Sequence, residues 1–168
     1  MKHELSILIP VYNEVCVSIV ERLAMLCRHR TAQQPSFRYE IIVADDASPR
    51  QETIESNRSI NEIAHCRFIE NTENRGAAAM RNFLARQSQY QWLLYLDCDM
   101  QIIADDFINR YLDGPDCGIV NGGIAIGPPP HGKGKNLRYL YEKRSEEAHD
   151  VEHRQRNPYR IPLDQLPG

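Results

Sequence analysis

The segment LLYLDCDM, residues 93–100, is an apolar run that ends on two carboxylates, Asp97 and Asp99. An apolar run of this length is typical of a buried strand. Two carboxylates a few ångströms apart repel each other by about 1 kcal/mol in water and by several times more where the dielectric is lower. A metal ion, an arginine or solvent must compensate this charge, and the surrounding sequence indicates which of them does.

Other apolar runs of strand length occur along the chain, with helical patterns between them. The predicted strands cover residues 5–11, 39–46, 66–71, 91–97 and 117–123. The first predicted helix has Asn13 as its N-cap and carries an apolar stripe from Val15 to Cys27. Further helices are predicted over residues 50–64, 76–89 and 105–113. Strands that alternate with helices predict an α/β fold, with a mostly parallel sheet and helices on both of its faces.

The sequence changes character after Gly123. Residues 127–136, GPPPHGKGKN, contain too much proline and glycine for regular structure and predict a loop. Residues 137–156 carry a helical pattern with many charges, and the last twelve residues contain three prolines. We therefore expect one α/β domain over residues 1–123 and a different region over residues 124–168.

Composition excludes several classes of protein. The 168 residues contain 26% charged and 42% hydrophobic side chains, as ordinary globular proteins do. A formal net charge of −3 provides no general attraction to nucleic acid or to an anionic membrane. The five cysteines form no CxxC pair, and no apolar stretch approaches the ~20 residues that span a bilayer. We expect a cytosolic (cytoplasmic) protein without a signal peptide or a transmembrane segment.

Polar side chains follow four of the predicted strands. They lie in the segments 10–14 (PVYNE), 45–49 (DDASP), 70–76 (ENTENRG) and 97–99 (DCD). In an open parallel sheet, ligands bind beyond the carboxyl ends of the strands. Each segment also has a simpler interpretation: Asp45 and Asp46 as a turn, Asp97 and Asp99 as solvated acids, Tyr12 as a core aromatic residue, and the arginines as a solvated surface. Four strand ends that all carry polar residues at one edge of the sheet are harder to explain by chance than a single one.

The residue types at this rim suit a metal-bound nucleoside diphosphate. Two carboxylates at D-x-D spacing are suitable ligands for Mg²⁺ or Mn²⁺, which proteins usually hold with one or two carboxylates and phosphate oxygens. Arg75 and Arg81 could donate charge-assisted hydrogen bonds to a diphosphate. Tyr12 offers a ring for stacking on a base, and Asp45 or Asp46 could accept a hydrogen bond from the base or the ribose.

Four segments, LSILIPVYNE, IIVADDAS, ENRGAAAMRN and WLLYLDCD, resemble the successive motifs of the family 2 glycosyltransferases with the GT-A fold. The resemblance runs from about residue 4 to residue 145. It implies a nucleotide-diphosphate sugar as the donor, most often a UDP-sugar, with Mn²⁺ or Mg²⁺ as the cofactor. It also implies Asp99 as the principal metal ligand, with Asp97 beside it nearer the ribose or sugar. The nucleotide-sugar-binding residues expected on this basis are Pro10, Tyr12, Glu14, Asp45, Asp46, Arg75, Gly76, Arg81, Asp97 and Cys98.

In inverting members of that family, a separate Asp or Glu deprotonates the acceptor hydroxyl. The acids after Gly123 include Glu142, Glu146, Glu147, Asp150 and Glu152, which lie among Lys and Arg as on a solvated helix face. We therefore expect residues 124–168 to begin the acceptor-side region of a longer transferase whose base lies beyond Gly168. The acceptor, saccharide or lipid-linked, is not identified by the sequence.

Two other classes of protein also place acids at the strand ends of a similar sheet. A nucleotidyltransferase would carry a glycine-rich basic loop after the first strand, where this chain has PVYNE. The second class is the binding and signalling modules. A module of the receiver type would carry a lysine after the fifth strand, where this chain has NGGIAIG, and the class also includes a metal-dependent nucleotide-binding module without transferase activity. Both remain alternatives to the transferase.

Overall fold

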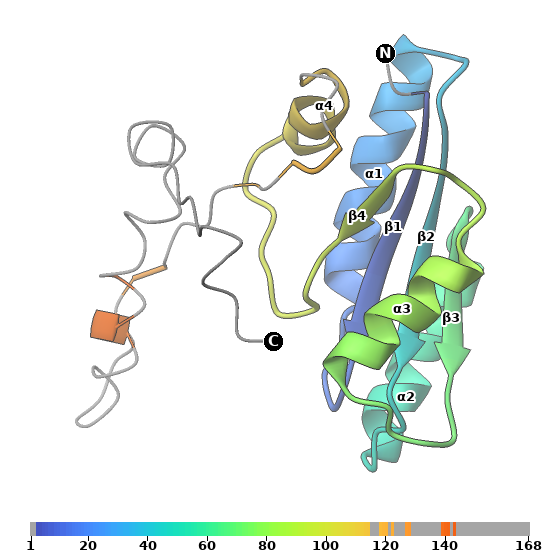
Figure 1. Cartoon of the computed structure of the whole chain (residues 1–168), viewed down its shortest axis with the longest axis vertical. Helices are drawn as coiled ribbons and strands as arrows, with labels where there is room; N and C mark the ends of the chain where they lie inside the picture. The colour runs from blue at the N-terminus through green and yellow to red at the C-terminus, as the bar shows by residue number, and fades with distance from the viewer. Residues whose placement is uncertain are drawn as a thin grey trace, which may run out of the picture. The chain divides into compact units, whose positions relative to one another are not determined.

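The described part of the chain is built around a four-stranded parallel sheet (Figure 1). In this computed structural model, the residues described are 3–114, 118–120, 122, 127–128, 139–141 and 143. The strands are β1 (Glu4–Val11), β2 (Arg38–Asp45), β3 (Cys66–Glu70) and β4 (Leu93–Tyr95), in the order β3-β2-β1-β4. The parallel α/β arrangement predicted from the sequence is therefore confirmed.

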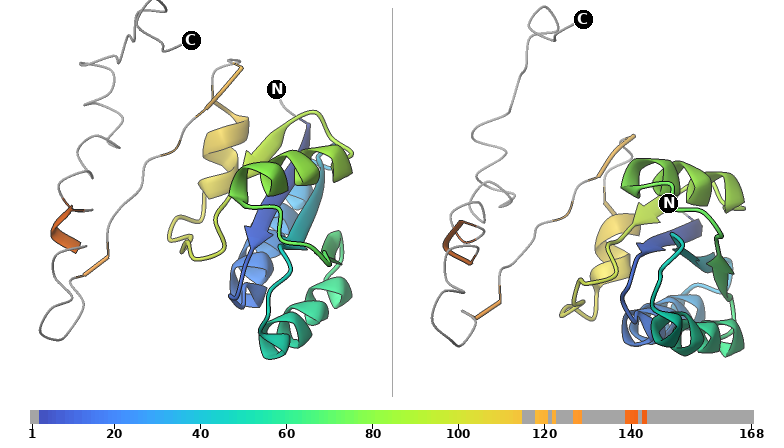
Figure 2. Two further views of the ribbon diagram at one scale, coloured as in Figure 1. Left: turned by 60° about the horizontal axis from the view of Figure 1, so that its bottom comes forward. Right: turned by 90° about the horizontal axis from the view of Figure 1, so that it is seen from below.

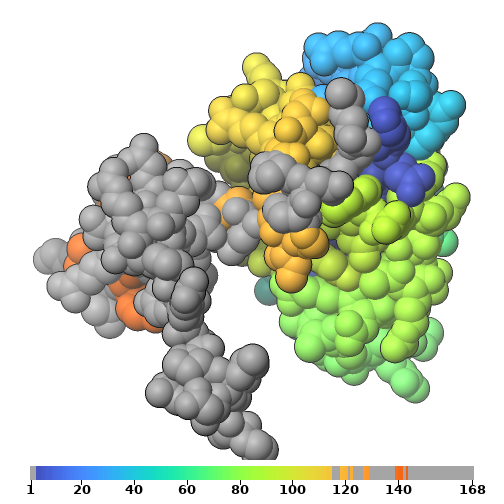
Figure 3. Space-filling view, turned by 45° about the horizontal axis from the view of Figure 1, so that its top comes forward, coloured from blue at the N-terminus to red at the C-terminus, as the bar shows by residue number. Residues whose placement is uncertain are grey.

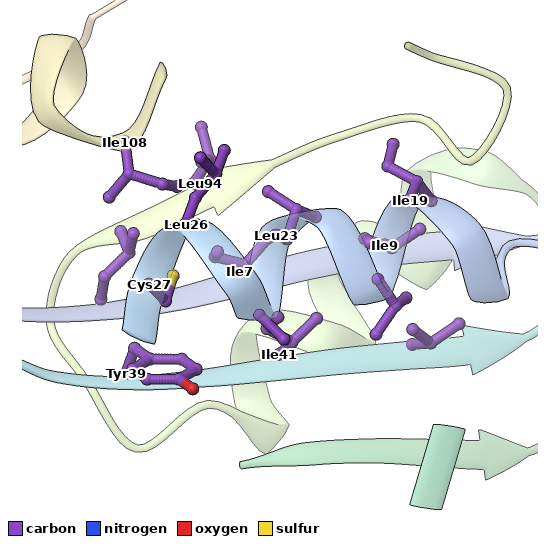
Figure 4. Packing of buried hydrophobic residues seen from close by; sticks show 14 of the residues in the cluster. Ile7, Ile9, Ile19, Leu23, Leu26, Cys27, Tyr39, Ile41, Leu94 and Ile108 are labelled. Carbon is purple, nitrogen blue, oxygen red and sulfur yellow. The ribbon is translucent and has the colours of Figure 1, made fainter. Parts of the chain in front are cut away.

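The two central strands, β1 and β2, are buried on both faces because each of them contributes to two clusters of apolar side chains. Alternate residues of a strand point to opposite faces. Ile7 and Ile9 therefore join a large cluster with α1, whereas Leu8 joins a smaller cluster on the other face. Figure 4 shows the large cluster, with Leu23 and Cys27 of α1 lying over Ile7, Ile9 and Ile41 of the sheet.

Helices cover both faces of the sheet, as the sequence predicts. On one face lie α1 (Val17–Gln33), α2 (Gln51–Arg58) and the short 3₁₀ helix η1 (Ser59–Glu62). On the other face lies α3 (Ala77–Gln87), which packs Met80 and Leu84 on the sheet. The right-hand view of Figure 2 shows α3 on the opposite side of the strands from α1 and α2.

A short fourth helix, α4 (Phe107–Leu112), packs against α1 through Ile108 and Leu112. Arg30 near the end of α1 donates two hydrogen bonds to the Asp113 carboxylate, at 2.8 and 2.6 Å, and a third to Asn109. In the space-filling view, the yellow surface of α4 lies beside the light-blue end of α1 (Figure 3).

The beginning of the first helix differs from the prediction. It starts at Val17 with Cys16 as the N-cap, so Asn13 is not the cap and Val15 is half-exposed rather than part of the core. Asn13 instead adopts a left-handed conformation, with φ 57°. Hydrogen bonds from residues far along the chain hold this segment outside the helix: Ser48 accepts from the Asn13 amide, and Asn57 accepts from the Cys16 amide.

Other elements are shorter than predicted, including the helices expected over 76–89 and 105–113, which cover Ala77–Gln87 and Phe107–Leu112. The helix expected over residues 50–64 ends at Arg58 and continues as the 3₁₀ turn η1, which is common at helix ends. The strand expected over residues 91–97 is assigned only at Leu93–Tyr95, although hydrogen bonds between Ser6 and Trp92 and between Leu96 and Leu8 extend its contact with β1.

Of the strand predicted over 117–123, the structure describes Gly118, Ile119, Val120 and Gly122, and none of these four lies in a strand. For these residues the prediction is wrong, because the side chain of Ile119 is almost fully exposed rather than buried between helices and sheet. Tyr139–Tyr141 and Lys143 are helical, as predicted. The rest of the predicted helix 137–156 and most of the loop 127–136 lie outside the described residues.

The chain divides into two units, Met1–Asp116 and Cys117–Gly168. The sheet, the helices α1 to α4 and η1 all belong to the first unit. The boundary after Gly123 that the sequence suggests stays a prediction. Within the described residues, no helix combines the length and the apolar character needed to cross a membrane.

The strand order creates a switch point between β1 and β4. From β1 the chain proceeds to β2 and β3 on one side, and β4 then pairs on the other side of β1. Connections that leave neighbouring strands in opposite directions open a crevice at their carboxyl ends, and ligands bind there in open α/β sheets. The segments after Val11 and Tyr95 are therefore the place to look for a site.

Candidate functional site

A cavity of about 480 Å³ lies at this switch point. Its walls come from the end of β1, from the segments after all four strands and from the first turns of α3. The residues that line it are Pro10, Val11, Tyr12, Glu14, Asp46, Asn74, Gly76, Ala77, Met80, Arg81, Asp97, Cys98 and Asp99.

The structure brings together all the site residues predicted from the sequence except two, Asp45 and Arg75, which do not line the cavity. It also adds Val11, Asn74, Ala77 and Met80 to the wall. Asn74 belongs to a segment that the sequence already placed at the rim. Ala77, Met80 and Arg81 are spaced by three and four residues, so a helix starting at Gly76 presents them on one face. That periodicity is the sequence feature by which Ala77 and Met80 could have been found.

Arg81 compensates one of the two carboxylates that follow β4. Its guanidinium donates to Asp97 Oδ1 at 2.6 Å, and both side chains remain about half exposed at the cavity wall. Arg81 comes from α3, which lies beside the end of β4: the Tyr95 hydroxyl donates to the Arg81 carbonyl at 3.0 Å. Asp99 is exposed and takes part in no ion pair with the described residues. The two acids of the DCD segment therefore differ: Asp97 already has a cationic partner, and Asp99 is available.

Asp46 holds the beginning of α3. Its buried carboxylate accepts hydrogen bonds from the backbone amides of Arg75, at 2.7 Å, and Gly76, at 2.9 Å. The Asn74 side chain donates to the Asp46 carbonyl at 2.9 Å. Gly76 is the N-cap of α3 with φ 78° and ψ 159°, a backbone conformation that is essentially restricted to glycine. These contacts place the first turn of α3, and with it Arg81, beside the cavity.

Asp45 belongs to a turn instead of the cavity wall. Its buried carboxylate accepts hydrogen bonds from the Ser48 amide at 2.8 Å and the Ser48 hydroxyl at 2.5 Å. The same hydroxyl accepts from the Asn13 amide at 2.8 Å and so connects the turn after β2 to the loop after β1. The simpler interpretation of Asp45, as an acid that stabilises its own turn, describes these contacts. A contact between Asp45 and a ligand stays a prediction.

Arg75 also has a different position from the one the sequence suggests. Its backbone amide binds Asp46, and its guanidinium lies over the ring of Phe83, 4.9 Å from the ring centre. A guanidinium at this distance from an aromatic face is stabilised by the cation–π interaction. Of the two predicted arginines, Arg81 is therefore the one whose side chain lies at the cavity.

Tyr12, Glu14 and Cys98 also belong to the wall of the cavity. Tyr12 is 49% exposed, so its ring is not the core aromatic that the simpler interpretation proposed. Burial raises the pKa of the Cys98 thiol, and the neighbouring charge of Asp99 raises it further. This higher pKa disfavours the thiolate, which is the reactive form of a cysteine.

The acids at the cavity suit a cation that brings further ligands of its own. Within the described ranges, no group of three or more His, Cys, Asp or Glu side chains comes together as a metal site. Mg²⁺ and Mn²⁺ in nucleotide sites are commonly held by one or two carboxylates, and phosphate and water oxygens complete the shell. Asp99 and Asp97 fit such a shared site and do not fit an all-protein metal site.

Comparisons with known proteins give the chain's relatives. It is 38% identical over 95 residues to an uncharacterized glycosyltransferase of Haemophilus influenzae and 33% identical over 97 residues to a chondroitin synthase of Escherichia coli. These matches span 56% and 57% of this chain but only 29% and 13% of the relatives, so the chain covers less than a third of their length.

Its fold is similar to that of a solved mannosyltransferase from Pyrobaculum calidifontis, determined in complex with GDP-mannose and Mn²⁺. The TM-score is 0.51 at 21% identity, over 74% of this chain and 36% of that one. The sequence profile described as glycosyl transferase family 2 matches residues 6–159. With its parallel sheet and this profile match, the chain belongs to glycosyl transferase family 2 and has the GT-A fold of that family.

Proposed function

We propose that this domain binds a nucleotide-diphosphate sugar in the cavity between β1, β4 and α3, and that it serves the transfer of the sugar to a saccharide or lipid-linked acceptor. One observation carries the proposal. The cavity at the switch point of the sheet is lined both by an exposed aromatic ring, Tyr12, and by the two acids of the DCD segment. These groups match the two ends of a nucleoside diphosphate, an aromatic base and a metal-bound diphosphate.

The proposed metal ligands are Asp99 first and Asp97 second. Both line the cavity, and Asp99 has no ion-pair partner among the described residues. A bound Mn²⁺ or Mg²⁺ would stabilise the negative charge that develops on the departing nucleoside diphosphate. The Mn²⁺ and GDP-mannose in the related mannosyltransferase support a divalent cation here. Arg81, already hydrogen-bonded to Asp97, is placed to contribute positive charge at the same point.

The proposed base-binding side is formed by Pro10, Tyr12 and Glu14, together with Asp46. The Tyr12 ring is exposed enough to stack on a base. Two backbone amides already occupy the Asp46 carboxylate, so Asp46 orients α3 and can accept a ligand hydrogen bond only through its remaining lone pairs. UDP is the nucleotide we propose, because UDP-sugars are the usual donors implied by the motifs.

We further propose that transfer proceeds by one in-line displacement that inverts the anomeric carbon. This step needs a base that takes the proton of the acceptor hydroxyl. We expect this base to belong to the acceptor-side region of the enzyme. The acids of that region in this chain, Glu142, Glu146, Glu147, Asp150 and Glu152, lie outside the described residues. The domain described here would accordingly bind the donor, and transfer would depend on the rest of the enzyme.

Calorimetric titration of UDP into the protein, with and without Mn²⁺, tests the proposal. We expect binding that requires the metal and that weakens at least about tenfold in Asp99→Ala, because the principal ligand of the cation is lost. Asp106→Ala is the matched control. It removes an exposed aspartate of α4 that pairs with Arg110 away from the cavity, and we expect UDP binding within about twofold of the unchanged protein.

The outcomes separate the alternatives. Metal-independent binding, or equal binding by the Asp99→Ala and Asp106→Ala proteins, would contradict the metal site. Tighter binding of UTP than of UDP and UDP-sugars would favour a nucleotidyltransferase. No binding of UDP, GDP or dTDP with any divalent cation would contradict the nucleotide-sugar site altogether.

A further inference from the structure

The loop between β1 and α1 is held at two points by polar side chains from outside it. Near its start, the Ser48 hydroxyl accepts a hydrogen bond from the Asn13 amide. Near its end, the Asn57 side chain of α2 accepts from the Cys16 amide at 2.9 Å and donates to the Glu14 carbonyl at 2.9 Å. Tyr12 and Glu14, which line the cavity, lie on this loop.

Asn57 is an unusual residue for its position in α2. The structure describes all eight residues of this helix, and Asn57, at 1% exposure, is its one buried side chain. An apolar residue is the usual occupant of such a position. Here the amide oxygen and the amide nitrogen both reach the backbone of the β1–α1 loop, which is more than 40 residues away along the chain. A buried amide with both ends bonded fixes its partners, because a displaced loop would leave buried polar groups unsatisfied.

The loop needs such support because its backbone is not regular. Asn13 has φ 57°, and neither the hydrogen bonds of β1 nor those of α1 extend over residues 12–15. A short irregular segment with exposed side chains is usually mobile, and ordering it upon ligand binding lowers affinity. Hydrogen bonds hold the Asn13 and Cys16 amides on either side of Glu14, so the loop is already ordered there and ligand binding has less conformational entropy to lose.

We propose that Asn57 is a positioning residue for the base-binding side of the cavity: its amide fixes Glu14 and Cys16, and so holds Tyr12 and Glu14 in the orientation that receives the base. Asn57 does not line the cavity itself and acts through the loop. This inference rests on the proposed nucleotide-sugar site. It extends that site to a residue of α2 that no motif of the sequence marks.

A change at Asn57 should affect binding of the base end of the ligand and of its diphosphate end differently. The diphosphate end of the proposed site is formed by Asp97, Asp99 and Arg81, which come from the segment after β4 and from α3, and the bonds that Asn57 makes go to Glu14 and Cys16 instead. Losing the amide should therefore weaken binding of a complete nucleotide and leave binding of a bare diphosphate almost unchanged. A general loss of folding would weaken both.

The experiment compares UDP with inorganic pyrophosphate by calorimetric titration, both with Mn²⁺, for the unchanged protein and for Asn57→Ala. We expect the dissociation constant for UDP to rise about tenfold in the variant and that for pyrophosphate to stay within about twofold. Asn61→Ala is the matched control. The exposed Asn61 side chain accepts from the Phe68 amide at 2.9 Å, a bond of the same kind on η1 away from the loop, and we expect no change for either ligand.

A second variant tests the donor of the amide separately. Asn57→Asp keeps an acceptor for the Cys16 amide, but its carboxylate sets an oxygen against the Glu14 carbonyl oxygen at a buried position, where the two repel. We expect it to weaken UDP binding at least as much as Asn57→Ala, by about tenfold or more, and to leave pyrophosphate binding within about twofold. Hydrogen exchange gives an independent readout: Asn57→Ala should accelerate exchange of the Cys16 amide, and Ser48→Ala that of the Asn13 amide.

The possible failures can be told apart. If the unchanged protein binds no nucleotide, the proposed function is overturned and the role of Asn57 with it, although faster exchange at Cys16 would still show that the amide holds the loop. If the unchanged protein binds UDP and Asn57→Ala binds it equally well, only the inference about Asn57 is overturned. Equal weakening of UDP and pyrophosphate would also overturn it, because the effect would not belong to the base-binding side.

Discussion

At the scale of single residues, two residues of the same type that are close in the sequence have different roles at this site. Asp45 stabilises the turn that carries Ser48, whereas Asp46 binds the amides that begin α3. Arg75 lies over Phe83, and Arg81 pairs with Asp97. The two members of each pair carry the same functional group, but their side chains lie in different places. The local backbone, more than the residue type, therefore decides which member lies at the cavity.

Gly76 offers a test of such a backbone requirement. A Cβ at Gly76 would meet no atom within 4 Å, so space does not restrict the position, but its φ of 78° does. We expect Gly76→Ala to lower the free energy of unfolding by about 1–3 kcal/mol because the substituted residue is strained. Gly118→Ala is the control, since a Cβ there also meets nothing and no positive φ is involved. Urea denaturation of the two variants would measure the difference, and equal stabilities would contradict the argument.

At the scale of elements, polar contacts supplement apolar packing in placing short segments. The six-residue α4 buries Ile108 and Leu112 in the large cluster, and an ion pair at each end also ties it to α1: Arg22 with Asp105 and Arg30 with Asp113. Asn57 has the same role for the β1–α1 loop. Specific polar partners therefore fix the position of short segments in addition to any burial of their apolar side chains.

The contact between Arg30 and Asp113 predicts a dependence of stability on pH. The hydrogen bond from Arg30 lowers the pKa of the Asp113 carboxyl. A carboxyl whose pKa is lower in the folded state stabilises the fold above its unfolded pKa, about 3.9, and loses that contribution as the pH falls through the folded pKa. We expect Asp113→Asn to cost about 0.5–1 kcal/mol at pH 7, because buried Arg30 loses its charged partner while solvent at the half-exposed Asp113 side chain screens the pair.

Denaturation curves at several pH values would check this prediction. The difference in the free energy of unfolding between the unchanged protein and Asp113→Asn should shrink steadily as the pH is lowered from about 5 toward about 3. The corresponding change Asp106→Asn affects an exposed pair within α4 and should cost less than about 0.5 kcal/mol at pH 7. A difference for Asp113→Asn that is independent of pH would show that its charge is not responsible.

At the scale of the whole molecule, the sheet and the cavity belong to one unit of the chain. Every residue that lines the cavity lies between Pro10 and Asp99, and the first unit ends at Asp116. We therefore expect a chain shortened to residues 1–116 to retain metal-dependent UDP binding within about threefold of the full chain. Calorimetry on this protein and on one ending at Gly123, the boundary expected from the sequence, would check it. Binding by the longer protein alone would place the boundary after Gly123.

Much of this arrangement follows from the sequence by itself. Apolar runs of strand length that alternate with helical patterns determine a parallel sheet with helices on both faces. Because the carboxyl ends of parallel strands meet at one edge, the polar segments after β1, β2 and β4 had to lie near each other. The order of residues along the chain therefore suffices to place Tyr12, one of Asp45 and Asp46, one of Arg75 and Arg81, and the acids Asp97 and Asp99 at one rim of the sheet, but not to choose within the two pairs.

Only the tertiary structure decided what each of those residues contacts. The start of α1 at Val17 depends on hydrogen bonds to Ser48 and Asn57, which local propensity does not contain. The pairing of Arg81 with Asp97 depends on how α3 lies over β4, and the role of Asp45 depends on the turn that follows it. Residue patterns encode which faces become buried, since burial is periodic along the chain. Polar contacts between distant segments have no such period, and they become visible only when the chain is folded.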